Sequence, residues 1–124
     1  MTHDIFTLHK DDLLIYASKM LDWSDYPSLC VEDKNGNLVG VIRSKQILNY
    51  YARAIKNKSK GTVKDVMDDQ PITVTQQMKI IDVIDIMKRN HLKMIPVVKG
   101  KELIGIISER DFMAMSKRLI ERTK

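Results

Sequence analysis

The order of apolar and polar positions in the second half of the chain predicts a β-α unit. The segment 72–74 has the composition of a short strand, and Thr75 is placed to cap a helix that ends at Asn90. Apolar residues at the i, i+3, i+4 and i+7 positions define one face of this helix: Ile80, Val83, Ile84 and Met87.

Two short apolar runs follow and predict a β-hairpin. Residues 94–98 (MIPVV) and 102–107 (ELIGII) are consistent with buried strands, and a Lys-Gly pair between them marks the turn. Ser108 is placed to cap a last helix, and the shared face of that helix holds Phe112, Met115 and Leu119. The second half therefore has the order β-α-β-β-α.

The first half repeats this order with a less regular first helix, in which Ser18 and Trp23 interrupt the aliphatic face. Between the halves, residues 62–67 predict a short helical turn. The expected elements of the first half are a strand at 5–8, a helix at about 12–23, strands at 28–33 and 38–42 around a turn at 34–37, and a helix from Ser44 to about Ile55.

Sliding the chain against itself indicates that the two halves are copies of one unit. At an offset of 66, residues 5–31 align with 71–97 without a gap. After the turns the offset becomes 65, and 38–42 (LVGVI) falls on 103–107 (LIGII). A unit of about 55 residues cannot bury both faces of a three-stranded sheet alone. We therefore expect an α+β fold in which two β-α-β-β-α repeats pack sheet to sheet about a pseudo-twofold axis.

The phrases of the second half stand in an order that resembles the cystathionine-β-synthase (CBS) repeat: VKDVM, PITV, IIDVIDIMKRN, MIPVV and LIGIISERDFM. The chain is similar to a tandem pair of such repeats, called a Bateman module. We place repeat 1 at 1–55, a basic connector at 56–62 and repeat 2 at 63–124. In repeat 1, Cys30 replaces the proline of the Pro-Val motif.

The resemblance implies a regulatory function without a catalytic step. Modules of this family bind adenosine-containing ligands, such as AMP, ADP, ATP, S-adenosylmethionine or NAD, in clefts between the repeats. They regulate enzymes or transporters, to which they are attached or on which they act. We expect a homodimer in which helices of two modules pack into a flat disc.

The segment GIISERD, at the start of the last helix, has chemistry suited to a nucleotide. The Asp111 carboxylate can accept hydrogen bonds from both ribose hydroxyls, and Ser108 can cap the helix or contact the ligand. In the family, the positions of Lys93 and Met94 often reach phosphates, and Arg110 is a further candidate. An alternative is that Ser108 and Asp111 only form a helix N-terminus. The expected ligand residues are Ile72, Thr73, Lys93, Met94, Ile95, Pro96, Ser108, Arg110 and Asp111.

The matching segment of repeat 1, GVIRSKQ, departs from this pattern. Gln46 cannot accept two hydroxyls with a full negative charge, and Arg43 takes the place of the serine. We therefore expect one competent site and one degenerate cleft, the latter near Thr7, Leu29, Arg43 and Gln46. Arg43 could instead contact a phosphate, so a different ligand in the first cleft stays open.

Two other functions stay open, and the first follows from the charge of the chain. The net charge is +5, and residues 53–64 carry five basic and no acidic side chains, which would suit a nucleic acid. A solvated connector is the favoured interpretation, because aromatic or amide base readers are not interleaved with these lysines. A purely structural dimerisation module without a ligand is the other alternative.

Neither a catalytic motif nor a set of metal ligands stands out in the sequence. HExxH and GxSxG do not occur, and the glycines of GKELIG lack the Lys-Ser/Thr of a phosphate-binding loop. Cys30 is the only cysteine, which excludes an internal disulfide and fits a reducing compartment. The apolar runs fall short of the roughly 20 residues of a membrane span, so we expect a cytoplasmic protein without membrane insertion.

Overall fold

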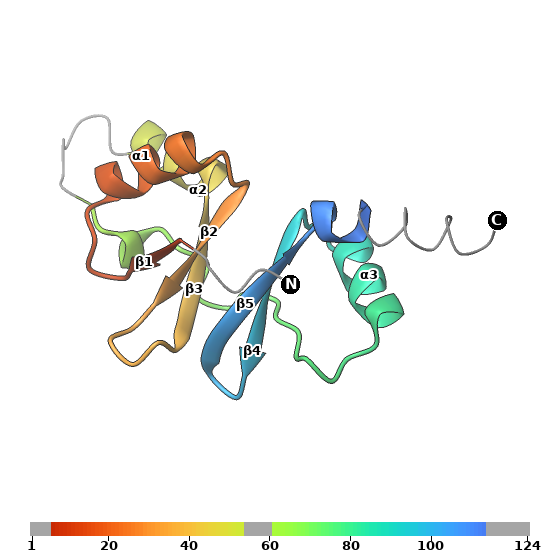
Figure 1. The fold of residues 1–124 in the computed structure, drawn as a ribbon. Coiled ribbons are helices and arrows are strands. Elements are labelled where there is room, and N and C mark those ends of the chain that lie inside the picture. Colours follow the sequence, from red (N-terminus) through yellow and green to blue (C-terminus); the bar gives the residue numbers. More distant parts are fainter. Residues whose placement is uncertain (1–5, 54–60, 114–124) are drawn as a thin grey trace.

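The computed structural model describes residues 6–53 and 61–113, in which two β-sheets lie next to each other with helices packed on each (Figure 1). Repeat 1 consists of β1 (Thr7–His9), α1 (Leu14–Ser24), β2 (Ser28–Glu32), β3 (Leu38–Arg43) and α2 (Ser44–Arg53). A short 3-10 helix, η1 (Val63–Asp65), leads to α3 (Ile80–Arg89), β4 (Met94–Lys99), β5 (Glu102–Ser108) and the helical residues 109–113, here called the final helix. The α+β fold with two repeats is confirmed.

Some expectations concern residues outside the described ranges. Residues 54–60, with most of the basic connector and the expected end of α2 near Ile55, are among them, as are Met115 and Leu119 of the final helix. Among the residues that are described, none of the helices has the length and apolar character needed to cross a bilayer.

Repeat 1 contains a three-stranded sheet in the order β1-β2-β3. Strand β1 runs parallel to β2, and β2 pairs antiparallel with β3. The Asp33 carboxylate shapes the turn between them by accepting hydrogen bonds from the backbone amides of Asn37 (3.0 Å) and Asn35 (2.8 Å). These bonds hold the pKa of Asp33 below its ordinary value. Gly36 supplies the positive φ of 81° that closes the turn.

The core of repeat 1 lies between this sheet and the helices α1 and α2. Helix α1 buries the i, i+3 and i+7 positions Leu14, Ala17 and Leu21, as an amphipathic helix should. Helix α2 adds Ile47, and the sheet adds apolar residues from each strand. The buried cluster comprises Leu8, Leu14, Ala17, Leu21, Leu29, Val31, Ile42, Ile47 and Val63.

Repeat 2 has a smaller sheet than the sequence suggested. Strands β4 and β5 form the expected antiparallel hairpin, but the expected strand at 72–74 is wrong as a regular element. Only Val74 pairs, as an isolated parallel bridge to Val97, with hydrogen bonds to Pro96 O (3.0 Å) and from Val98 N (2.9 Å). This bridge occupies the place of the β1–β2 pairing in repeat 1, reduced to one residue.

The expected helix start at Thr75 is also wrong. The Thr75 carbonyl accepts a bond from the Met78 amide in a turn, and α3 begins only after Lys79. Lys79 has the extended conformation φ −67°, ψ 143°, and its counterpart Leu13 before α1 has φ −67°, ψ 142°. Neither side chain caps its helix, so no Ser, Thr or Asp marks the true boundary.

Direct contacts between equivalent residues confirm the internal pseudo-twofold axis. The Ser28 hydroxyl meets the Met94 sulfur at 4.0 Å, and these residues hold the same position in the two repeats. The Leu38 amide donates to Lys101 O (2.9 Å), and Leu103, the counterpart of Leu38, donates its amide to Gly36 O (3.0 Å). This reciprocal pair places the axis between the two β-turns.

The segment after η1 packs along β3 and joins the repeats. Val41 and Asp68 exchange both of their backbone hydrogen bonds (3.0 and 2.9 Å). The approach is so close that a Cβ on Gly40 would lie 2.5 Å from the Met67 sulfur and 2.9 Å from the Asp68 carbonyl oxygen. Position 40 therefore requires glycine for packing.

Candidate functional site

A cavity of about 400 Å³ opens between the two repeats, at the end of the β4-β5 hairpin where the final helix begins. Repeat 2 contributes residues on either side of the hairpin end, and repeat 1 contributes the loop after α1. We call this cavity the inter-repeat cleft. Its lining residues are Ser24, Asp25, Tyr26, Pro27, Lys93, Met94, Ser108, Glu109 and Arg110.

Four of the expected ligand residues line the inter-repeat cleft: Lys93, Met94, Ser108 and Arg110. Lys93 and Arg110 are exposed at its rim, together with the acidic Asp25 and Glu109. The charged side chains of the lining therefore balance, two basic against two acidic. A phosphate would find cations here, but in competition with the two carboxylates.

Asp111 directly follows Arg110 of the cleft lining, is not itself one of the lining residues, and is half-buried. Its Oδ2 accepts hydrogen bonds from the backbone amide (2.7 Å) and the hydroxyl (3.3 Å) of Ser108. The start of the final helix is further tied to β4 by the Glu109 amide, which donates to Lys93 O at 3.0 Å. Asp111 thus stabilises the helix N-terminus, and its contact with a ribose stays a prediction.

Repeat 1 makes the same local structure with an amide in place of the carboxylate. Gln46 Oε1 accepts the backbone amide of Arg43 at 2.8 Å, which is the counterpart of the Ser108–Asp111 bond. Position 46 thus keeps the capping function while it carries no charge. The other residues of the expected degenerate cleft are engaged elsewhere: the Thr7 hydroxyl donates to Glu32 (2.7 Å), and Leu29 is buried in the core.

Three other expected ligand residues lie where the two sheets meet. Ile72, Ile95 and Pro96 face residues of repeat 1, including Arg43, around a gap of only about 10 Å³. A space of this size holds about one water molecule. Thr73 is half-buried beside this contact. A base could enter between the sheets only if the repeats moved apart.

Sequence reasoning missed the cleft residues contributed by repeat 1. In the repeat alignment, Asp25, Tyr26 and Pro27 correspond to His91, Leu92 and Lys93. Because Lys93 was an expected ligand residue, its alignment with Pro27 was a signal that the loop of repeat 1 also lines a cleft. The signal was missed because a site built on repeat 2 was expected to use repeat 2 residues. In a pair related by an internal axis, each cleft takes side chains from both repeats.

Within residues 6–53 and 61–113, no group of three or more His, Cys, Asp or Glu side chains is arranged to hold a metal ion. Cys30 is buried in β2 and unpaired.

Comparison with known families gives the same division of the chain. The model of the CBS domain matches residues 1–53 and 63–118. The chain belongs to the CBS domain family. The two matched segments correspond to the two repeats related by the internal axis, so this protein is a pair of CBS domains.

Relatives of this CBS pair match it over different shares of their own length. An uncharacterized protein YlbB of Bacillus subtilis is 29% identical over 113 residues, which cover 90% of this chain and 74% of that protein. The inosine-5'-monophosphate dehydrogenase of Methanocaldococcus jannaschii is also 29% identical, over 92% of this chain but only 22% of that enzyme. The chain thus matches a minor part of the dehydrogenase.

Solved structures share the fold along most of the chain. A putative acetoin utilization protein (AcuB) from Vibrio cholerae superposes with a TM-score of 0.86 at 23% identity, covering 98% of this chain and 89% of that one. The structure of CBSX2 in complex with AMP has a TM-score of 0.84 at 22% identity, covering 96% and 93%. At these identities the likeness establishes the arrangement of the elements.

Proposed function

We propose that this CBS pair is a regulatory module that binds an adenosine-containing ligand in the inter-repeat cleft. The carrying observation is the cavity of about 400 Å³ at the N-terminus of the final helix, lined by residues of both repeats. Support comes from CBSX2, a protein of the same fold that was crystallised with AMP. The candidate ligands are AMP, ADP, ATP, S-adenosylmethionine and NAD.

Asp111 is the proposed ribose contact. A carboxylate has roughly four acceptor positions, so it can keep its bonds to Ser108 and also accept ribose hydroxyls. Lys93 and Arg110 at the rim would contact phosphates. The base would take the space beside Tyr26 and Met94, or part the sheets at Ile72, Thr73, Ile95 and Pro96.

Binding would act through the relative position of the repeats. The described contacts on the pseudo-twofold axis include the reciprocal hydrogen bonds of the turns and the Ser28–Met94 contact. A ligand that touches both repeats favours the arrangement that it fits best, and so shifts the population of inter-repeat angles. We propose that a homodimer in the cytoplasm passes this change to a partner enzyme or transporter.

The experiment compares three substitutions against a panel of the five ligands. Asp111→Asn keeps an amide oxygen for the Ser108 amide, as Gln46 does for Arg43, so the fold should persist. The loss of charge-assisted bonds to the ribose should weaken binding by about 10- to 100-fold, from about 1.5 to 3 kcal/mol. Asp111→Ala should lose both the cap and the ligand. Calorimetry measures affinity, and thermal unfolding measures stability.

Gln46→Ala is the matched control. It removes the equivalent cap from the repeat whose cleft lacks a carboxylate, so it should lower the melting temperature as Asp111→Ala does. Its ligand affinity should equal that of the parent chain. If Asp111→Asn bound as tightly as the parent, or if none of the five ligands bound at millimolar concentration, the proposal would be wrong.

A second candidate function is a structural module that binds no nucleotide. The closed contact of about 10 Å³ between the sheets favours it, because the expected ligand residues Ile72, Ile95 and Pro96 lie at this contact. This function predicts an unchanged melting temperature with each of the five ligands and an unchanged oligomer mass. Such a result would select it over the ligand-binding function.

A further inference from the structure

A closed space between the two sheets lies where the internal axis predicts a second cleft. This space, of about 10 Å³, is here called the inter-sheet gap. Three of its lining residues are counterparts of residues that line the inter-repeat cleft: Arg43 of Ser108, Ser28 of Met94, and Leu92 of Tyr26. One half of the chain thus forms an open cleft of about 400 Å³, while its counterpart has room for about one water molecule.

Arg43 is placed in the inter-sheet gap by the register of the strands in repeat 1. It pairs with Ser28 across β3 and β2, and the next pair on the same face of the sheet is Val41 with Cys30. Repeat 2 contributes an opposing wall of apolar residues, such as Ile72. Among the described residues that line the gap, Arg43 alone carries a charge. Its side chain therefore lies between the sheet of repeat 1 and an apolar wall.

The stem and the guanidinium of Arg43 have different surroundings. The residue is half-buried, and in the described part of the chain no ion pair or side-chain hydrogen bond engages its guanidinium. No buried side-chain nitrogen or oxygen lacks a hydrogen-bond partner among the described residues, so the guanidinium must reach water. The buried part is thus the aliphatic stem, which packs on apolar surface while the charge stays solvated.

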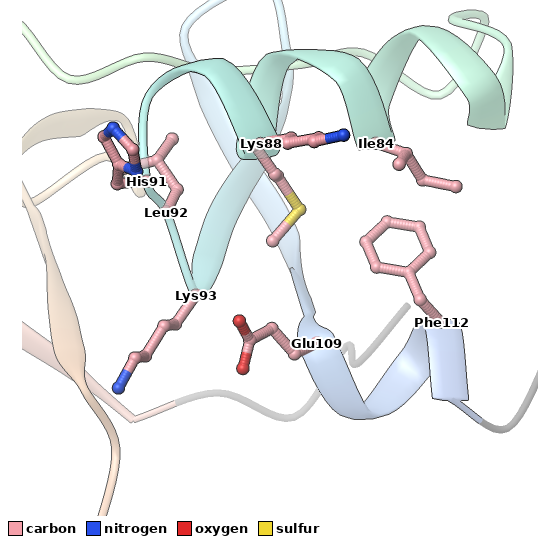
Figure 2. Close-up of a pocket in the computed structure, with 8 residues that line it drawn as sticks. Ile84, Lys88, His91, Leu92, Lys93, Glu109 and Phe112 are labelled. Atoms are coloured by element: carbon pink, nitrogen blue, oxygen red, sulfur yellow. The ribbon is translucent and has the colours of Figure 1, made fainter.

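Apolar residues separate the inter-sheet gap from two neighbouring hollows. Met94 lines both the gap and the inter-repeat cleft. Leu92 lines both the gap and a hollow of about 430 Å³ between α3 and the final helix, and Figure 2 shows it beyond the end of α3. Leu92 also packs against the buried cluster of repeat 2, which fixes its position. The side of the gap that faces water is therefore bounded by Arg43 and by Ile72, which is 40% exposed.

We infer that the stem of Arg43 closes the second cleft and so limits this CBS pair to one bound nucleotide. Serine at the equivalent position 108 leaves the inter-repeat cleft open, whereas the longer arginine side chain fills the corresponding place in the other half. Gln46 deprives that half of a charged ribose acceptor, but Arg43 prevents entry of the base altogether. The limit of one nucleotide rests on the proposed function, and the closure rests on the geometry of the gap.

Cys30 reports whether the inter-sheet gap is open, because it lines the gap and is the only cysteine of the chain. It is buried, so the parent chain should react slowly with iodoacetamide in native buffer. Arg43→Ser should raise the alkylation rate at least several-fold, as measured by mass spectrometry. Arg43→Met is the matched control, because it keeps an unbranched stem without the charge, and its rate should stay near that of the parent.

Val83→Ala distinguishes local opening of the gap from general unfolding. Val83 is buried in repeat 2 and does not line the gap, so its truncation lowers stability without moving Arg43. Arg43→Ser should react faster than Val83→Ala, although its melting temperature should be the higher of the two. An unchanged rate in Arg43→Ser, an equal rise in Arg43→Met, or an equal rise in Val83→Ala would each overturn the closure.

Calorimetry with AMP tests the limit on binding. The parent and Gln46→Asp should each bind one AMP, whereas Gln46→Asp combined with Arg43→Ser should bind two, because its second cleft is both open and supplied with a carboxylate. Two AMP bound by Gln46→Asp alone, or one by the double variant, would overturn the limit. If AMP binds to the parent while Arg43→Ser is alkylated no faster, this inference fails alone. If no variant binds AMP, the proposed function fails with the limit, and alkylation still decides the closure.

Discussion

Cys30 occupies the place in β2 that Pro96 occupies in β4, and its side chain is 5% exposed. Burial, together with a smaller effect of the negative charge of the nearby Glu32, raises the pKa of its thiol to about 12. The folded chain thus holds the thiol in its neutral form at pH values where an unfolded chain would release the proton. This makes Cys30 a source of alkaline instability.

We expect the free energy of unfolding to fall between pH 9 and pH 12 because the Cys30 thiol ionises more readily in the unfolded chain. The unfolded thiol ionises above its reference pKa of 9.0 while the folded one does not, so the contribution is complete below pH 9 and is lost as pH rises toward 12. At pH 10.5 the loss should be about 2 kcal/mol. Urea denaturation at pH 8 and pH 10.5 measures it.

The control for this prediction is Cys30→Ala. Tyrosines and lysines also titrate at high pH, so the difference between the two proteins is the quantity of interest. The variant should start less stable at pH 8 and lose less on going to pH 10.5. Equal losses in the two proteins would contradict the assignment.

Single residues were predictable from the sequence where local chemistry decides their contacts. Asp111 and Ser108 were singled out together, and they are hydrogen-bonded at the start of the final helix. Tyr26 was not assigned to a cleft, because its position there depends on how the repeats pack and no local pattern encodes that contact. The direct ligand contacts of Asp111 remain a prediction.

Helices α1 and α3 are each followed, within two residues, by a residue with a left-handed backbone. Asp25 has φ 60° and His91 has φ 54°, and the two are counterparts. At α3 the bonds of a Schellman motif are complete: the Leu92 amide donates to Met87 O (2.9 Å) and the His91 amide donates to Lys88 O (3.3 Å). A side chain at this φ is strained, and glycine is the residue this motif normally takes.

We therefore predict that His91→Gly stabilises the chain. Removing the strain at φ 54° should add about 0.5 to 1 kcal/mol net of the entropy of glycine, which raises the melting temperature by about 2 to 4 °C. His91→Ala is the control, because it removes the imidazole but keeps the Cβ. A rise in the alanine variant as large as in the glycine variant would assign the effect to the imidazole and contradict the backbone argument.

Elements with a strong apolar period were predictable, and their boundaries were not. The hairpin β4-β5 and the buried face of α3, with Val83 and Met87, follow from spacing alone. The start of α3 at Ile80 does not, because Lys79 lacks a capping side chain and Thr75 is a misleading alternative. The missing strand at 72–74 depends on tertiary pairing, which leaves only Val74 bonded.

The described part of the molecule has two buried clusters, and we expect the molecule nevertheless to unfold as one unit. Repeat 2 has only a two-stranded sheet in its described part, and such a hairpin is marginal without a packing partner. Its contact with repeat 1 leaves a gap of only about 10 Å³ between the sheets. We expect this contact to couple the repeats.

Native-state hydrogen exchange tests the coupling. The amides of Val31 in β2 and Val97 in β4 are counterparts in central positions, and they should exchange with the same free energy of opening, that of global unfolding. Leu38→Pro, which removes the amide that bonds to Lys101 O, should lower both values together. Val97 exchanging at a clearly lower free energy than Val31 would mean that repeat 2 opens alone.

The overall arrangement of the two repeats was predictable because the sequence itself shows two copies of one unit. Two copies at an offset of 66 require an internal axis, and the Ser28–Met94 contact lies on it. The shape of the cleft was not predictable, because it depends on the distance between the sheets. Residues such as Ile72 and Arg43, which line the gap between the sheets, set that distance, and they have no signature along the chain.

The reciprocal contacts on the internal axis have a consequence for how such a protein can diversify. When two identical subunits meet on a symmetry axis, one mutation alters both sides of the contact at once. Once the halves are fused in a single chain, each side can change while the other is conserved. Ser28 opposite Met94, and Gln46 where the other half has Asp111, are outcomes of that freedom. Fusion thus allows one half to specialise in holding a ligand while the other is kept for architecture.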